Sequence, residues 1–347
     1  MRKRLFFIAT IVLVSTGLML FVQRFYPQQQ MPVGVAIDVQ TPQPEKYHDD
    51  CLHPCIRQLG DSLYAMVQSP YYAGDNKVEN PILYVSNSYS SWKNGFLIDD
   101  TPEIGYNSDP NIFIENNKTY VFWRRYGSPE CKEIVYGRHV TDTAADKSNC
   151  PPLLTPYISS DYENISYTQC PILIKKNGRY LFYAAWHQYH PRRKNKGMAI
   201  WDGTSLDKPN FKLTDTIPFH NPLVCDKLFQ IKIIGKIFYL PKPKRYDLWH
   251  FDLFEYGDKL FMVSCGEKDD NIMLSVSDDW KHFKTSRTPL LNNHCSENYT
   301  GYRQYYYKPT AFVKNDSLYL FYTANDEKNP KRNRLYLSRA AMKELKY

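Results

Sequence analysis

A hairpin pattern that recurs five times along the chain limits the fold more than any other feature of the sequence. Each copy joins a short apolar strand to a second, aromatic-rich strand through a tight polar turn, such as Gly257-Asp258 or Asn315-Asp316. Turns of this chemistry between apolar runs indicate β-hairpins. The copies occupy residues 53–66, 109–123, 170–183, 250–263 and 308–322. The chain is therefore predicted to build five equivalent sheets.

Most copies continue into a third strand, as at residues 82–86 and 272–276, and turns ahead of Trp92 and Trp280 lead into a fourth. Four strands that recur every roughly 55 to 80 residues form a propeller blade, because each sheet needs its neighbours to bury both faces. We therefore predict an all-β fold, a five-bladed β-propeller over residues 48–340 with a C-terminal tail at 341–347. A β-sandwich would explain the alternation but not the fivefold recurrence. The 29 Tyr and 18 Phe residues agree with a strand-rich fold.

The first two dozen residues differ from the rest of the chain. Arg2, Lys3 and Arg4 precede an apolar run over residues 5–22 that is long enough to span a bilayer. Because no small-residue cleavage site or lipobox cysteine follows, residues 1–24 are predicted to be an uncleaved N-terminal transmembrane helix rather than a signal peptide. The basic flank places the remaining chain outside the cytoplasm, in the periplasm or at the cell surface. Residues 25–47, with their Gln and Pro content, are predicted to be a linker.

Eight cysteines, an even number, agree with an oxidising compartment. Cys51 with Cys55, or Cys131 with Cys150, could close local loops by disulfide bonds. The spacing contains no CxxC pair, so a structural zinc site is disfavoured.

The formal net charge of +8 is concentrated in part at residues 192–196 and 242–245. The simplest interpretation is a solvated basic surface. An exported domain does not meet nucleic acid, so a binding role for these charges would favour an acidic glycan or a phosphorylated polymer.

Short motifs at the predicted strand starts resemble those of known proteins. The motifs are His53-Pro54, Glu79-Asn80-Pro81, Ser108-Asp109-Pro110, Trp249-His250-Phe251-Asp252 and Tyr307-Lys308-Pro309. Over residues 48–340 the chain resembles poorly characterised bacterial proteins, several of them encoded near surface-polysaccharide genes. More broadly it resembles the five-bladed glycosidases of glycoside hydrolase families 43 and 32.

The resemblance implies a glycoside hydrolase that acts on a surface or secreted polysaccharide. In those glycosidases an aspartate followed by proline at the start of an innermost strand is the form of a catalytic carboxylate, and Asp109 has this form. The first blade departs from the pattern, because His53 stands where those enzymes carry an aspartate. The three catalytic carboxylates of those enzymes therefore cannot be assigned residue by residue in this chain. Asp109 alone matches one of them by its local motif.

Propeller geometry predicts where these residues meet. The innermost strands all begin at one end of the central channel, so His53, Asp109, Cys170, His250 and Lys308 are expected to ring one opening of a funnel. Loops from the second to the third strand of each blade return to the same face. They are expected to add Glu79, Asn80, Arg124, Arg125, Glu130, His187, His190, Glu267, Asp269 and Asp270 to the rim.

Glycoside hydrolysis needs two carboxyl groups, one protonated and one ionised. Asp109 is the candidate base or nucleophile and Glu79 the candidate acid, while Asp252 shares a strand face with His250 and could tune either of them. Each has a structural alternative: a strand-entry aspartate before proline, a solvent-exposed glutamate, and a buried aspartate satisfied by a neighbouring blade.

His53, Arg124, His250 and Lys308 are the candidate substrate-binding residues. Three tryptophans could stack on sugar rings, although packing in the core is favoured; they are Trp123, Trp186 and Trp249. No cofactor is required, but His53, Asp109, His250 and Asp252 could together hold zinc, manganese or calcium, without any specific spacing that points to one. A noncatalytic carbohydrate-binding propeller is the alternative function.

Overall fold

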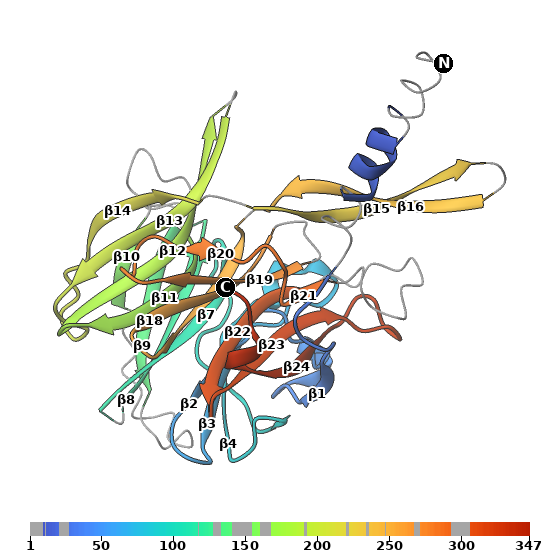
Figure 1. The fold of residues 1–347 in the computed structure, drawn as a ribbon. Helices are drawn as coiled ribbons and strands as arrows, with labels where there is room; N and C mark the ends of the chain where they lie inside the picture. Colours follow the sequence, from blue (N-terminus) through green and yellow to red (C-terminus); the bar gives the residue numbers. More distant parts are fainter. Residues whose placement is uncertain are drawn as a thin grey trace, which may run out of the picture.

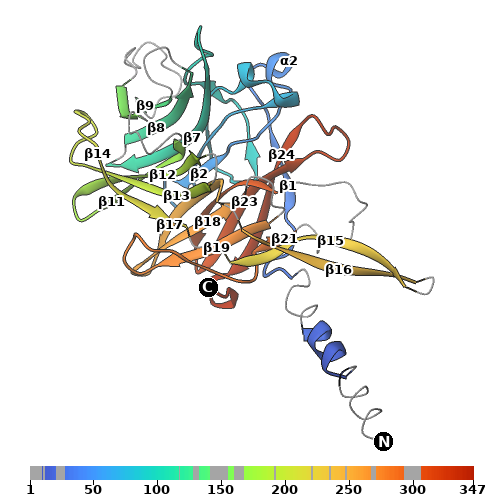
Figure 2. The same cartoon turned by 90° about the horizontal axis from the view of Figure 1, so that it is seen from above.

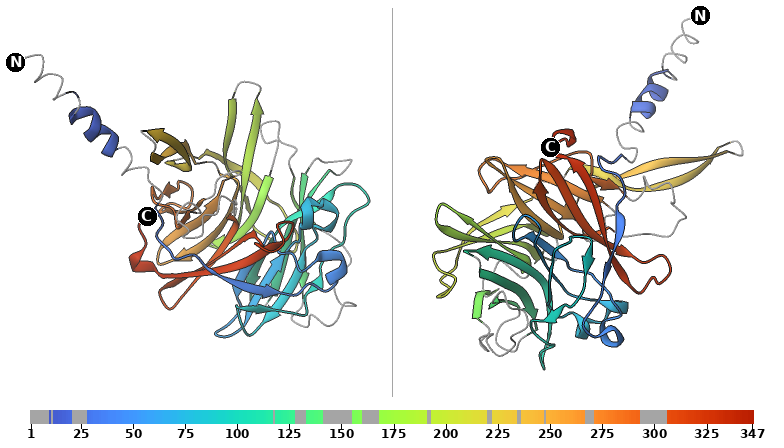
Figure 3. Two further views of the ribbon diagram at one scale, coloured as in Figure 1. Left: turned by 90° about the vertical axis from the view of Figure 1, so that its right-hand side faces the viewer. Right: turned by 90° about the horizontal axis from the view of Figure 1, so that it is seen from below.

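Five β-sheets stand around a common axis in the computed structural model, which confirms the predicted five-bladed propeller (Figures 1 and 3). The structure describes residues 10, 12–20, 28–116, 118–127, 133–140, 155–159, 168–190, 193–219, 222–233, 236–246, 248–266, 271–292 and 306–347.

The first three blades follow the chain from the axis outward. The first contains β2 (Cys55–Gln58), β3 (Tyr64–Gln68), β4 (Ile82–Ser86) and β6 (Phe96–Leu97). The second contains β7 (Tyr106–Glu115), β8 (Lys118–Tyr126), β9 (Glu133–Val140) and β10 (Thr155–Ser159). The third contains β11 (Thr168–Lys176), β12 (Arg179–His190), β13 (Arg193–Gly203) and β14 (Lys212–Pro218).

The last two blades are built in the same way. The fourth contains β17 (His250–Tyr256), β18 (Lys259–Cys265) and β19 (Asn271–Ser277), with β20 (Lys284–Thr285) and β21 (Leu291–Asn292) both paired to β19. The fifth contains β22 (Tyr307–Lys314), β23 (Ser317–Asn325), β24 (Asn333–Ala341), β1 (Val35–Val39) and β5 (Ser91–Trp92). The innermost strands β2, β7, β11, β17 and β22 contact one another around the axis.

Strand β1 closes the ring. It pairs with β24 in antiparallel register, with Val35 opposite Leu337 and Ile37 opposite Leu335. Without β1, the last blade would end in an edge of unpaired backbone groups. The prediction of a simple linker over residues 25–47 therefore differs from the structure, which has β1 and helix α2 (Pro44–Tyr47) in this segment.

The predicted tail at residues 341–347 also packs on the propeller. It contains the short 3-10 helix η4 (Met342–Glu344), and both Met342 and Leu345 are buried between the fourth and fifth blades. Two further 3-10 helices, η1 (Tyr72–Gly74) and η2 (Asn76–Val78), lie between β3 and β4.

Ile37→Ala is expected to lower the free energy of unfolding by about 2 to 5 kcal/mol, because it removes apolar volume from the core that β1 completes. Ile37 is 4% exposed, whereas Val35 on the same strand is 69% exposed. The matched variant Val35→Ala is expected to change stability by less than about 0.5 kcal/mol. Urea unfolding measures both, and equal effects would contradict the role of β1 in closing the ring.

Apolar clusters fill the spaces between neighbouring blades. One joins Val67 of the first blade to Trp123 of the second, and another joins Tyr64 of the first blade to Phe321 of the fifth. Corresponding clusters lie between the second and third, third and fourth, and fourth and fifth blades. Each blade thus needs both of its neighbours, which is the physical reason for the recurring hairpin.

Cys51, Cys55 and Cys170 are buried and form no disulfide bond. The predicted Cys51–Cys55 disulfide is wrong, because Cys51 packs in the core between the fifth and first blades and Cys55 in the core between the first and second. The alternative Cys131–Cys150 pair lies outside the described residues.

Two features lie apart from the ring. Strands β15 (Leu223–Ile233) and β16 (Lys236–Arg245) form a separate two-stranded sheet that the sequence analysis did not anticipate (Figure 2). Residues 12–20 are helical. In the described part of the chain, no helix is both long enough and apolar enough to cross a membrane.

Candidate functional site

Three of the five strand starts share an unusual backbone. Asp109, Cys170 and Lys308 each precede a proline and have positive φ values of 50°, 52° and 41°. At the same three places the register with the neighbouring strand shifts. A left-handed φ in a residue other than glycine costs on the order of 1–3 kcal/mol, and such irregularities re-aim side chains at functional sites. The residues before proline in the second, third and fifth blades therefore share one backbone irregularity, which occurs at the same place in each blade.

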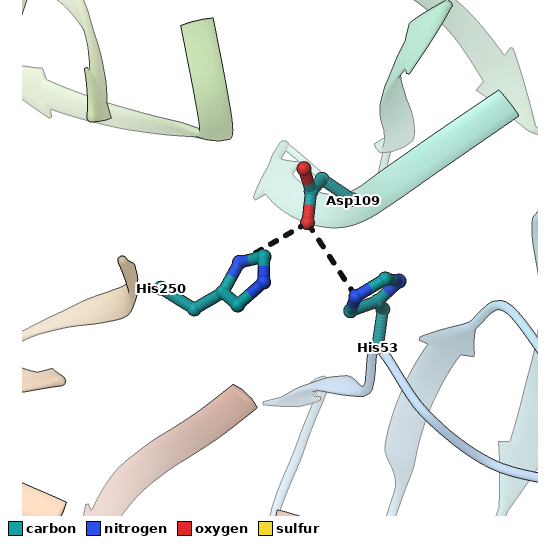
Figure 4. Close-up of side chains that lie close together, drawn as sticks. All are labelled: His53, Asp109 and His250. Atoms are coloured by element: carbon teal, nitrogen blue, oxygen red, sulfur yellow. Dashed lines mark ion pairs between the residues drawn. The ribbon is translucent and has the colours of Figure 1, made fainter. Parts of the chain in front are cut away.

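The five predicted positions come together around the carboxylate of Asp109. Its Oδ1 lies 3.3 Å from His250 Nδ1 and 3.9 Å from both His53 Nε2 and Lys308 Nζ. Its Oδ2 lies 3.3 Å from Arg124 Nε. Figure 4 shows the two imidazoles approaching the carboxylate from different blades. The Asp109 carboxylate and the four side chains around it are all buried.

Asp109 is held as an anion. Burial by itself would raise its pKa, but the charges of Arg124 and Lys308 hold it well below the usual range. Asp109 is fully buried. An ionised carboxylate in such a place requires compensating positive charge, which the two cations supply.

Glu79 orients the imidazole of His53. Its Oε1 lies 2.9 Å from His53 Nδ1 and also accepts a hydrogen bond from the Ser108 hydroxyl. The Ser69 hydroxyl lies 3.2 Å from the same ring nitrogen. Proton donation from Nδ1 to the carboxylate leaves the Nε2 lone pair facing Asp109. Glu79 is buried, which differs from the solvent-exposed alternative considered for it.

Tyr307 orients the imidazole of His250. Its hydroxyl lies 2.5 Å from His250 Nε2 and accepts a hydrogen bond of 2.9 Å from Trp249 Nε1. Burial lowers the pKa of His250 well below its usual value, so this imidazole is neutral at pH 7. Its Nδ1 therefore faces Asp109 as a neutral ring nitrogen.

Cys170 and Lys308 complete the wall of the cluster. The thiol sulfur of Cys170 lies 2.7 Å from Lys308 Nζ and 2.7 Å from His250 Nδ1. Burial raises the pKa of Cys170, so the thiol stays protonated. Burial alone would lower the pKa of Lys308, but its hydrogen bond to the Cys170 sulfur and the charge of the Asp109 carboxylate raise it, so the ammonium stays charged.

Asp252 is held by Arg57 of the first blade and Thr310 of the fifth. Arg57 donates to both of its carboxylate oxygens, at 2.6 and 2.7 Å, and the Thr310 hydroxyl donates at 2.6 Å. Burial would raise the pKa of Asp252, but the ion pair with Arg57 lowers it. These contacts tie the fourth blade to the first and fifth, as in the structural alternative.

The other rim candidates divide into four groups. Trp123 and Trp186 are buried in the cores between blades, whereas Trp249 is half-buried. Arg125 pairs with Asp99 at 2.5 Å, away from the cluster. Asn80 is buried and donates hydrogen bonds to Asp100 and Thr101. The other candidates are outside the described residues, or have side chains that are: Glu130, His187, His190, Glu267, Asp269 and Asp270.

A cavity of ≈ 480 Å³ opens at the opposite ends of the innermost strands. Its lining includes the last residues of these strands, among them Gln58, Glu115, Lys175 and Glu255. Arg57, which pairs with Asp252, also lines it, and Asp109 does not.

Sequence reasoning missed Tyr307, Ser69 and Arg57. Tyr307 immediately precedes Lys308 in the Tyr307-Lys308-Pro309 motif. Its position next to a predicted site residue was therefore the signal that could have identified it. Arg57 is a lone charged residue on an innermost strand. Because buried charged side chains are usually paired, its position was a sign that an acidic partner lies nearby. No local signal marks Ser69.

Comparison with known proteins supports the fold. No family model and no curated protein sequence matches this chain. Among solved structures, an N-acetylgalactosamine deacetylase from F. plautii, in complex with blood group B trisaccharide, aligns with a TM-score of 0.62 at 13% identity, covering 92% of this chain and 96% of that one. An α-L-arabinofuranosidase from Lactobacillus brevis aligns with a TM-score of 0.55 at 12% identity, covering 83% and 90%.

A family 43 subfamily 1 enzyme from Xanthomonas citri, complexed with xylotriose, aligns with a TM-score of 0.55 at 11% identity, covering 89% of this chain and 90% of that one. At these identities the likeness is one of fold. The chain shares the five-bladed β-propeller fold with these structures, as its recurring hairpin predicted.

Proposed function

We propose that this protein is a carbohydrate hydrolase whose centre is a divalent metal site formed by His53, Asp109 and His250. The observation that carries the proposal is the placement of their ligand atoms, which all lie within 4.8 Å of one another. The three residues come from three different blades and are buried. Two imidazoles and one carboxylate suit zinc or manganese, and three protein ligands leave a coordination position open for water or substrate.

The surroundings of both imidazoles fit a metal site. Histidine ligands usually donate their second ring N–H to a carboxylate or another acceptor, which fixes the ring and its tautomer. Glu79 stands in this position for His53, and Tyr307 does so for His250. Metal ligands must also be unprotonated. The lowered pKa values of Asp109 and His250 meet that requirement.

Two neighbours compete with a metal ion at this place. Lys308 shares the Oδ1 oxygen of Asp109, and the Cys170 thiol contacts the His250 nitrogen that would bind the ion. Ion binding must displace the thiol contact and act against the charge of Lys308. The site is therefore expected to bind its ion reversibly.

The proposed reaction is removal of an acyl group from a carbohydrate. A bound metal ion would supply a polarised water or carbonyl. Lys308 and Arg124 place positive charge beside the centre, where the oxyanion of acyl transfer develops. Glycosidic cleavage needs a protonated carboxylic acid instead. Both Asp109 and Asp252 have lowered pKa values, so that acid would have to be Glu79, whose Oε1 already contacts His53 and Ser108. The structurally similar F. plautii protein is an N-acetylgalactosamine deacetylase, which agrees with this choice.

Glycosidic cleavage is the second candidate, with Glu79 as acid and Asp109 as base. One observation favours it: only the imidazole of His53 separates the two carboxylates, which contact opposite ring nitrogens. Some of the structurally similar proteins are glycoside hydrolases. The N-terminal sequence supports a membrane-anchored, extracytoplasmic protein, and its substrate would then be a surface or secreted polysaccharide, acidic glycans included.

The test is an assay of the full chain on acetylated oligosaccharides and polysaccharides, with acetate and new reducing ends measured in parallel. We expect acetate without reducing ends, loss of activity with a chelator, and recovery with zinc or manganese. Reducing ends released without any metal requirement would favour glycosidic cleavage. Glycan binding without either product would indicate the noncatalytic carbohydrate-binding module.

Glu79→Gln is expected to weaken zinc binding by about 10- to 100-fold, because the amide is a poorer acceptor for the His53 N–H. Lys308→Met is expected to strengthen it, because a competing charge is removed. Calorimetric titration with zinc measures both affinities.

Glu115→Gln is the matched control. Glu115 lies at the far end of its strand and pairs with Lys175, so its replacement should leave zinc affinity unchanged. Equal affinities for wild type, Glu79→Gln and Lys308→Met would contradict the metal site.

A further inference from the structure

The far end of the central channel holds a cavity that the proposed reaction does not use. Its volume of ≈ 480 Å³ is within the range of sites that hold small ligands. Its walls are the last residues of the five innermost strands, whereas the Asp109 cluster lies at the first residues of these strands. Glu115 at the cavity is six residues beyond Asp109 on β7, which is roughly 20 Å of strand. The cavity and the cluster are therefore separate sites.

The register of four hairpins decides which backbone groups the walls present. In each hairpin only two residues separate the last opposed pair of the innermost strand and its neighbour, so that pair is hydrogen-bonded. The residue one position earlier then turns its backbone N–H and C=O away from the neighbouring strand and towards the axis. We call these four positions the outer level; they are Ile114, Lys175, Glu255 and Val313.

Hydrogen bonds one step deeper in the channel agree with this direction. The backbone N–H groups of Leu253 and Ala311, two residues before Glu255 and Val313, donate to the Asp252 carboxylate at 2.9 and 3.2 Å. At the outer level, no described residue pairs with the backbone groups that face the axis. The outer level therefore offers four N–H donors and four C=O acceptors to whatever fills the cavity.

The charged side chains around the cavity mostly compensate one another. Arg57 pairs with Asp252, and Lys175 pairs with Glu115. Glu255 is exposed and forms no ion pair within the described part of the chain. The cavity thus carries little net charge, and its main recognition groups are the backbone groups of the outer level.

A hydroxyl-rich ligand fits this ring of backbone groups better than an ion or a peptide. A cation would face the N–H groups of the outer level, and an anion would face its C=O groups. An extended peptide pairs along one strand edge, so it would leave the other edges unpaired. A sugar hydroxyl donates and accepts at the same time, which matches both kinds of group. The half-buried ring of Phe113, also in the lining, offers an apolar surface to a sugar ring.

We propose that this cavity binds a short neutral oligosaccharide through the outer level. It would hold glycan at the end of the propeller opposite to the Asp109 cluster, and the inference is independent of the reaction proposed there.

The test is hydrogen–deuterium exchange of the full chain, with xylotriose, cellotriose, maltotriose and chitotriose added in turn. Backbone amides of the outer level are expected to exchange about tenfold or more slowly with at least one of these sugars, because a hydrogen-bonded amide must open before it exchanges. Asp109→Asn should keep this protection, because it changes the other end of the channel. Failure of the proposed reaction and failure of this inference are therefore distinguishable.

Glu255→Arg places a larger side chain in the cavity and should abolish the protection. Asp258→Arg, the same change of charge in the adjacent turn, should keep it. Both residues are exposed, so both variants should fold. Unchanged exchange with all four sugars would overturn the proposal, as would wild-type protection in Glu255→Arg. Protection by trigalacturonate or calcium chloride, without protection by the neutral sugars, would also overturn it and would indicate an ion site instead.

Discussion

Asp109→Asn is expected to reduce kcat/KM roughly a thousandfold or more, because it removes the only carboxylate of the proposed metal site and leaves two buried cations without their counter-charge. Asparagine tolerates the left-handed backbone that Asp109 adopts, so the chain path should persist. Acetate release and zinc titration of the same preparation measure the effect. Zinc binding should be lost together with turnover.

Asp202→Asn serves as the control for Asp109→Asn. Asp202 forms an ion pair with Arg179 on the surface of the third blade, so its replacement should preserve activity. Wild-type turnover in Asp109→Asn would refute the assignment of Asp109. Turnover lost with zinc affinity intact would instead place Asp109 in the acid–base pair of a glycosidase.

Asp252→Asn is expected to lower the free energy of unfolding by about 3 to 5 kcal/mol, because it leaves the buried guanidinium of Arg57 without its charged partner. The double variant Arg57→Met/Asp252→Leu removes both charges and should recover most of that loss. Chemical denaturation measures both variants. A double variant no more stable than Asp252→Asn would contradict the ion pair as the cause.

The same pair predicts a pH dependence of stability. The pKa of Asp252 is lower in the folded state than in the unfolded state. Its contribution is therefore complete above the unfolded value of about 3.9 and is lost as the pH falls through the folded value. Wild type should lose stability in this acidic window. Asp252→Asn should lose less over the same window, and parallel curves for the two proteins would show that the carboxylate does not titrate there.

The local patterns of the sequence were sufficient for the architecture and for the five strand-start positions that meet at the axis. Alternating apolar residues, polar turns and X-Pro steps depend on near neighbours in the chain, so they could be recognised without a structure. They correctly placed His53, Asp109, Cys170, His250 and Lys308 at one end of the axis. The roles of these residues stay predictions until the experiments above are done.

Other features depended on residues far apart in the sequence. The partner of Asp252 is Arg57, 195 residues away, and nothing near either residue indicates the pairing. Cys51 and Cys55 show the opposite case, in which near neighbours in the sequence are separated in the fold. They are four positions apart, but they pack on opposite sides of the first blade, in two different hydrophobic cores.

The sequence alone thus determined a five-bladed propeller and the five strand-start residues that meet at its axis, since both follow from a repeated local unit. Only the tertiary structure decided that β1 completes the fifth blade, that Glu79 holds His53, and that Tyr307 holds His250. Each of these contacts joins residues that no single hairpin contains. Which residues meet in this way depends on how the blades and their loops fold together.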